Sequence, residues 1–158
     1  MPGYRAHLAC ALFLYGGVLL IVGSMLNSWT IGLGGLIAMC AGALFPDIDI
    51  KSKGQHYLYR MYALALVGVL CLYWLHGTQL WIDLIICIAV VTIAPMLARH
   101  RGITHSPPFI MLLGLSAWII GAGLYPAYTS PFFFYAACFV LGALSHVWLD
   151  KRRIFFYK

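Results

Sequence analysis

The chain has 158 residues, of which 63% are hydrophobic and only 9% are charged. Soluble domains carry about 25% charged residues, so the composition excludes a soluble globular protein and indicates a single transmembrane domain over residues 1–158. The net charge of +6 is what cytoplasmic loops of a membrane protein produce, because they collect Lys and Arg, so we expect membrane lipids as partners and no nucleic acid.

Six apolar segments predict an all-α, polytopic membrane bundle of about six transmembrane helices. A helix needs roughly 20 residues to cross the hydrocarbon core, so the second and third segments are short by this measure. Pro95 interrupts the fourth segment, whose last turn is therefore predicted to bend. The segments are about Leu8–Leu26, Ile31–Phe45, Met61–Leu75, Trp81–Leu97, Phe109–Tyr125 and Phe132–Leu149.

The positively charged residues fall into alternate connections between these segments. Six crossings place all ten of them on one side of the membrane, whereas five or seven crossings would divide them between both sides. The positive-inside rule then predicts that both termini face the cytoplasm. The basic residues are Arg5, Lys51, Lys53, Arg60, Arg99, Arg101, Lys151, Arg152, Arg153 and Lys158.

The cysteines are not expected to take part in the chemistry. Each lies inside an apolar segment, and none forms a Cys-x-x-Cys pair. Free cysteine in such a place behaves as a small buried hydrophobic residue, so we expect neither disulfides nor thiolate ligands. The five cysteines are Cys10, Cys40, Cys71, Cys87 and Cys138.

The second apolar segment ends in Pro46-Asp47-Ile48-Asp49. Asp47 and Asp49 are two of only four acidic residues in the chain, and carboxylates beside a membrane span usually have a partner. In extended backbone, residues two apart point to the same side, so both carboxylates could face one cation. The alternative is a solvated turn after Pro46.

A polar, basic loop, Arg99–Pro108, separates the fourth and fifth segments. Ser106 followed by Pro107 is typical of a helix N-cap and first turn, so the loop is predicted to end at a helix start. A lone histidine is more often structural than ligating. The presence of both His100 and His105 in one short loop, opposite the Asp pair, favours metal ligands.

The last segment ends with His146 and Asp150, which are four residues apart. On a helix this spacing puts both side chains on one face, about one turn apart, where they can share a metal ion. The alternative is an interfacial histidine that is hydrogen-bonded to an aspartate at a helix end. His7, before the first span, joins the set because six crossings place it on the same side.

Together these side chains predict a metal site with imidazole and carboxylate ligands. Such ligands suit Zn²⁺, Mn²⁺ or Fe²⁺; we expect Zn or Mn, with enough groups for two ions bridged by an aspartate. Two-metal sites hydrolyse phosphoesters, so Asp49 or His100 is expected to transfer the proton. Arg101, with Arg99 beside it, is expected to bind the substrate phosphate. The predicted ligands are His7, Asp47, Asp49, His100, His105, His146 and Asp150.

The residues alone leave three kinds of function open. The first is a membrane-embedded hydrolase that acts at the cytoplasmic face on a phosphoester of a lipid or lipid-linked substrate. The second is a transporter, although none of the segments carries the mid-bilayer ionisable groups that transporters usually have. The third is a non-catalytic, metal-stabilised docking protein for a cytoplasmic regulator. His56, His76 and Asp83 receive no role.

Three blocks of the sequence, Gly42–Asp49, His100–Ser106 and Gly142–Asp150, occur in an order that resembles the YdjM-like family. These proteins are described as metal-dependent hydrolases of the bacterial inner membrane, and the family name also mentions LexA. The resemblance implies a multi-pass protein of the bacterial inner (cytoplasmic) membrane. It also implies a hydrolase site formed by Asp47, Asp49, His100, His105, His146 and Asp150.

Overall fold

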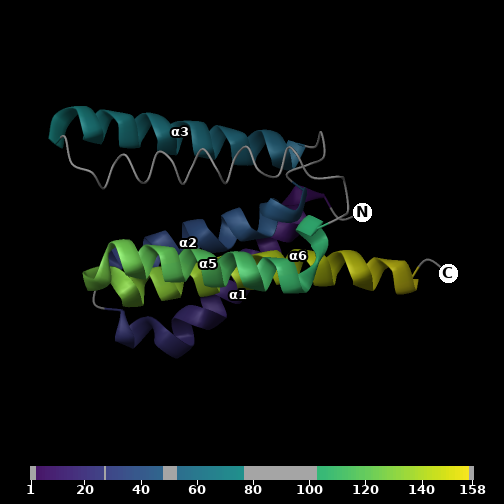
Figure 1. Cartoon of the computed structure of the whole chain (residues 1–158). Coiled ribbons are helices and arrows are strands. Elements are labelled where there is room, and N and C mark those ends of the chain that lie inside the picture. Colours follow the sequence, from purple (N-terminus) through teal and green to yellow (C-terminus); the bar gives the residue numbers. More distant parts are fainter. Residues whose placement is uncertain (1–2, 27, 48–52, 77–102, 157–158) are drawn as a thin grey trace.

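The structure is a computed structural model that describes residues 3–26, 28–47, 53–76 and 103–156. These parts contain helices and no strands, which confirms the predicted all-α class. The long helices, labelled in Figure 1, are α1 (Tyr4–Val22), α2 (Trp29–Leu44), α3 (Lys53–His76), α5 (Pro107–Leu124) and α6 (Thr129–Phe156). The 3₁₀ turns are η1 (Gly23–Met25), η2 (Phe45–Asp47), η4 (Ile103–His105) and η5 (Pro126–Tyr128).

The described parts contain five helices that are long and apolar enough to cross a membrane. They correspond to the first, second, third, fifth and sixth apolar segments of the sequence. The fourth segment, Trp81–Leu97, lies outside the described residues. The count of six crossings and the cytoplasmic orientation of both termini therefore stay predictions.

Large apolar side chains cover the outside of the bundle, as a lipid environment requires. Phe13, Leu20 and Trp74 are 83%, 90% and 85% exposed. The expectation that the cysteines are buried is correct for Cys138 but wrong for Cys71, which is exposed. Cys71 lies on α3, where few of the described side chains are buried, so a position within an apolar segment does not ensure burial.

Helices α2 and α6 make the most extensive contact between elements of the described parts. A Cβ atom added to Gly42 would overlap with the carbonyl group of Phe139, and one added to Gly142 would overlap with that of Met39. Small residues let helix backbones approach closely in membranes. The two glycines therefore set the distance between the end of α2 and the second half of α6.

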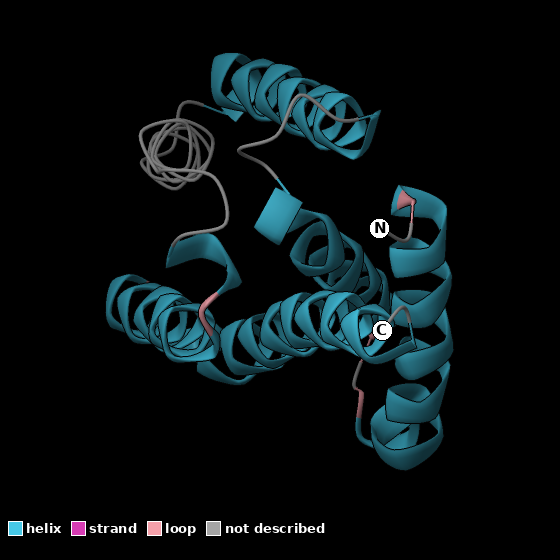
Figure 2. Ribbon diagram, turned by 90° about the vertical axis from the view of Figure 1, so that its right-hand side faces the viewer, coloured by secondary structure: helices cyan, strands magenta, loops and turns pink. Residues whose placement is uncertain are grey.

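The remaining helices are arranged around this central pair. Helix α1 packs on α2 and α6, α5 packs on α6, and α3 runs alongside with its main contacts to α2 and η2 (Figure 1). Figure 2 looks onto the end of the bundle at which both termini lie. We call this the site end, because the ionisable side chains described below gather there.

Candidate metal centre

Four ionisable side chains from three separate segments meet at the site end. Asp47 is the last residue of η2, His105 is the last residue of η4, and His146 and Asp150 lie one turn apart on α6. Each offers one ligand atom, and these atoms all lie within 4.8 Å of one another. The cluster, which we call the metal centre, could therefore hold a metal ion.

The distances within the centre suit ligands that surround a cation. His146 Nε2 lies 3.5 Å from Asp47 Oδ1 and 3.6 Å from Asp150 Oδ2. His105 Nε2 lies 3.7 and 3.9 Å from the same two oxygens. Charge-assisted hydrogen bonds are shorter, at about 2.7–2.9 Å. Tetrahedral ligands at about 2.0–2.1 Å from a metal ion would lie about 3.4 Å apart, which is closer to the observed spacing.

Helix packing determines which nitrogen of His146 faces the centre. The side chain is 1% exposed, and its Nδ1 lies 2.7 Å from the carbonyl oxygen of Ala43 in α2. A carbonyl can only accept, so Nδ1–H donates and the lone pair of the neutral ring is on Nε2, which faces both carboxylates. A second hydrogen bond of this kind is usual for metal-binding histidines.

His105 is held at the start of α5 by a short turn. Thr104, which is 1% exposed, places its Oγ1 atom 3.3 Å from His105 Nδ1. Ser106 occupies the N-cap position and Pro107 begins the helix, as the sequence predicts, although the Ser106 side chain makes no capping hydrogen bond. The turn directs His105 Nε2 towards the two carboxylates.

His7 lies beside the centre, at 1% exposure. Its ring stacks on that of His146, with the centroids 3.7 Å apart and the planes inclined by 12°. His7 Nε2 lies 3.7 Å from Asp150 Oδ1, whereas the other oxygen of Asp150 faces His105 and His146. The two oxygens of the Asp150 carboxylate therefore face different imidazoles, one facing His7 and the other facing His105 and His146.

The centre concentrates buried carboxylate oxygens that have no Lys or Arg partner in the described parts. Asp47 Oδ1, Asp150 Oδ1 and His146 Nε2 are buried and have no hydrogen-bond partner within the described parts. The ion pairs of both carboxylates in these parts involve histidine only. Uncompensated buried charge is strongly unfavourable, and a divalent cation would neutralise the two carboxylates.

One local expectation from the sequence is wrong, and one alternative interpretation is excluded. Asp47 belongs to a 3₁₀ turn and not to extended backbone, because the chain keeps a helical conformation past Leu44. Asp150 is not at a helix end, since α6 continues to Phe156. Its 3.6 Å separation from His146 Nε2 is also too long for the direct hydrogen bond of the alternative interpretation.

The structure brings together His105, His146, Asp47 and Asp150 and places His7 next to them, all predicted ligands. The other predicted site residues, Asp49, His100, Arg99 and Arg101, lie outside the described residues. The two orienting groups, the Ala43 carbonyl and the Thr104 hydroxyl, do not stand out in the sequence. A backbone carbonyl has no side-chain pattern by which it could be found, whereas Thr104 is at least adjacent to a predicted ligand.

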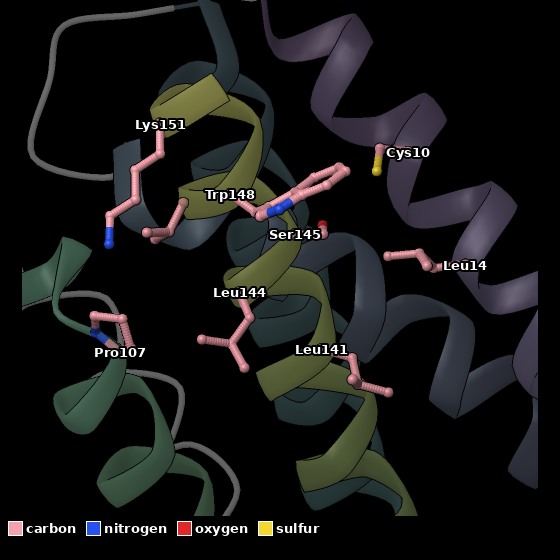
Figure 3. Close-up of a pocket in the computed structure, with 9 residues that line it drawn as sticks. Cys10, Leu14, Pro107, Leu141, Leu144, Ser145, Trp148 and Lys151 are labelled. Carbon is pink, nitrogen blue, oxygen red and sulfur yellow. The ribbon is translucent and has the colours of Figure 1, made fainter. Parts of the chain in front are cut away.

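An apolar groove of about 530 Å³ lies on the opposite face of α6, between α1 and α5 (Figure 3). Leu144 and Trp148 point into it, about half a turn around α6 from His146 and Asp150. The groove is therefore separate from the metal centre, although its Lys151 end is level with Asp150 along the helix. Its lining residues include Cys10, Leu14, Pro107, Leu141, Leu144 and Lys151.

These features define an α-helical membrane protein with a candidate metal-binding centre at one end of its bundle. The chain belongs to the YdjM inner membrane protein family, whose sequence model matches residues 1–152. The match confirms the family resemblance of the three sequence blocks. No curated protein and no solved structure matches the chain at a significant level.

Proposed function

We propose that this protein is a multi-pass, metal-dependent hydrolase that acts at the cytoplasmic face on a phosphoester of a lipid or lipid-linked substrate. The observation that carries the proposal is the metal centre, in which four ligand atoms lie within 4.8 Å of one another. A site at the end of a membrane bundle lies close to lipid headgroups. Phosphoesters are the hydrolysable groups that such headgroups share.

The ligand set supports Zn²⁺ or Mn²⁺ as the metal, in one or two ions. A divalent cation in the centre would act as a Lewis acid towards the phosphoester and would activate water. The chain itself orients the ligands: Ala43 fixes His146, and Thr104 contacts His105. If two ions are bound, Asp150 would be a ligand to both, because one of its oxygens faces His7 and the other faces His105 and His146. Asp49 or His100 keeps the predicted role in proton transfer, and Arg99 and Arg101 that in phosphate binding.

The apolar groove supports a substrate with a hydrocarbon chain. It is lined mostly by apolar side chains and has Lys151 at one end (Figure 3). A chain lying in the groove would bring its polar headgroup to the level of Asp150, where the Lys151 amine can bind an anionic group. The groove therefore favours a lipid over a soluble phosphoester as substrate.

The proposal is tested by metal analysis of the purified full-length protein together with an assay on inner-membrane lipid extract. We expect bound Zn or Mn and the release of phosphate or a phosphorylated headgroup, and we expect EDTA to abolish that release. Full turnover after EDTA treatment would contradict metal dependence. Bound metal without any release would contradict the hydrolase and favour the metal-stabilised docking protein.

Filling the groove should impair lipid turnover selectively. Leu141 lines the groove and is 43% exposed, so Leu141→Trp should fold while it blocks a bound chain. Loss of contact with one or two methylene groups should lower kcat/KM for a long-chain lipid about tenfold, with no change for a short water-soluble phosphoester. Ile119→Trp, at a 57% exposed position on α5, serves as the control. Equal losses on both substrates would exclude a chain-binding role.

A further inference from the structure

A second cavity at the site end has a lining that is rich in cationic groups. It has a volume of about 420 Å³ and lies between the start of α1 and the beginning of α3. Two guanidinium groups and one imidazole line it, and they come from two different helices. The lining residues are Tyr4, Arg5, His56, Tyr57 and Arg60.

Aromatic contacts give this cavity a defined wall. The rings of Tyr4 and Tyr57 stack with their centroids 5.1 Å apart, which joins α1 to α3. Arg5 Nε donates a hydrogen bond to the Tyr4 hydroxyl at 3.3 Å, and its guanidinium carbon lies 5.9 Å from the centroid of the same ring. Arg5 is therefore held against the wall with its terminal N–H groups available to a ligand.

The positive charge of the cavity has no counter-charge within the described parts. The carboxylates of these parts, Asp47 and Asp150, both belong to the metal centre, and neither pairs with Arg5 or Arg60. The positive-inside rule requires only that basic residues lie on one side of the membrane. It does not require guanidinium groups from two helices to line one cavity, where a single anion could contact both.

The cavity is also close to the metal centre. Tyr4 precedes His7 by three residues on α1, which is about 4.5 Å along a helix axis. Tyr4 packs against the apolar cluster that contains Phe45, two residues before Asp47. The Tyr4 wall of the cavity is therefore about one helical turn from His7 along α1, on the N-terminal side.

We infer that the cavity formed by Tyr4, Arg5, His56, Tyr57 and Arg60 binds the phosphate group of an anionic ligand. Arg5 and Arg60 supply the planar donor groups that match phosphate oxygens, and His56 adds a further donor. This binding is independent of hydrolysis. If the proposed function is correct, the ligand is the substrate, and the cavity holds a phosphate of its headgroup next to the metal centre.

The test compares phosphate binding by the purified full-length protein and by Arg5→Gln/Arg60→Gln, each with and without EDTA. One titration uses inorganic phosphate, and another uses phosphatidic acid in mixed micelles with a neutral detergent. Removing two charge-assisted contacts should weaken binding about 100-fold. Arg152→Gln/Arg153→Gln removes the same number of charges from α6, beyond Asp150, and should change affinity less than about threefold.

The two ligands distinguish the source of the phosphate. If the double variant binds both inorganic phosphate and phosphatidic acid more weakly, phosphate itself is sufficient for binding. If it binds only phosphatidic acid more weakly, a lipid headgroup is required. Either outcome supports the site. Wild-type affinity of the double variant for both ligands would overturn it. Because binding persists in EDTA if the inference is correct, an absence of hydrolysis does not affect the result. An unchanged thermal unfolding midpoint of the double variant shows that folding is intact.

Discussion

Replacing His146 with alanine should abolish stoichiometric binding of a divalent metal. The substitution removes the ligand atom that lies closest to both carboxylates, at 3.5 and 3.6 Å, and it leaves two negatively charged groups facing each other. Removal of groups that merely orient ligands lowers metal affinity about 10–100-fold, so loss of a ligand should exceed about 100-fold. The measurement is metal content by elemental analysis after gel filtration in detergent.

His146 also packs against His7 and binds the Ala43 carbonyl, so its removal could disturb folding. Asp150→Asn keeps the shape of the side chain and removes only its charge, and it should lose metal to a comparable degree. Metal at about 100 times its Kd raises the free energy of unfolding of a folded protein by about 2.7 kcal/mol. This stabilisation by added metal should be seen in the wild type and be absent in both variants. His56→Gln removes an imidazole outside the centre and should retain the metal. Wild-type metal content in His146→Ala and Asp150→Asn would refute the centre.

The membrane helices could be predicted from the sequence because a helix needs a long apolar segment to cross the hydrocarbon core. The residues at which the helices end could not be predicted. The last apolar segment stops at Leu149, whereas α6 continues to Phe156. Hydropathy marks where a chain leaves the hydrocarbon core, and a helix can continue beyond that point because water and headgroups tolerate Lys151 on its surface.

The grouping of the site residues could be predicted in the same way. Alternation of the charged connections placed His7, Asp47, His105, His146 and Asp150 at one end of the bundle, where the structure has them. The detailed contacts depend on how closely the helices pack, and a linear sequence does not show this. The Ala43 carbonyl that orients His146 belongs to this class of contact.

The cationic cavity could not be predicted from the sequence for the same reason. His56 had no partner that the sequence could identify, because Arg5 is on another helix and the two are brought together only by the packing of α1 near α3. Basic residues near membrane spans are so common that composition alone gives them no further role. Their arrangement around one cavity is what gives Arg5 and Arg60 a candidate role beyond the orientation of the membrane spans.

Substitution of Gly142 by alanine should destabilise the bundle and weaken metal binding together. The added methyl group would overlap with the carbonyl oxygen of Met39 and would lie 3.0 Å from the backbone nitrogen of Ala43. Backbone atoms cannot move aside as a flexible side chain can, so α2 and α6 must separate. Overpacking of this kind lowers the free energy of unfolding by about 1–3 kcal/mol, and occasionally more.

Separating α2 from α6 should also disturb the metal centre. The hydrogen bond from His146 to the Ala43 carbonyl, which is 2.7 Å long, joins the same two helices near this crossing. Moving α2 away from α6 also moves Asp47 away from His146. Thermal unfolding and metal content are measured on the same preparation. Gly42→Ala, whose added methyl group would overlap with the backbone of Phe139, should show the same two losses as Gly142→Ala. Gly68→Ala on α3 has open space around its added Cβ and should be neutral or stabilising by up to about 1 kcal/mol. If Gly142→Ala matched Gly68→Ala in both measurements, the close glycine crossing could not be what positions the ligands.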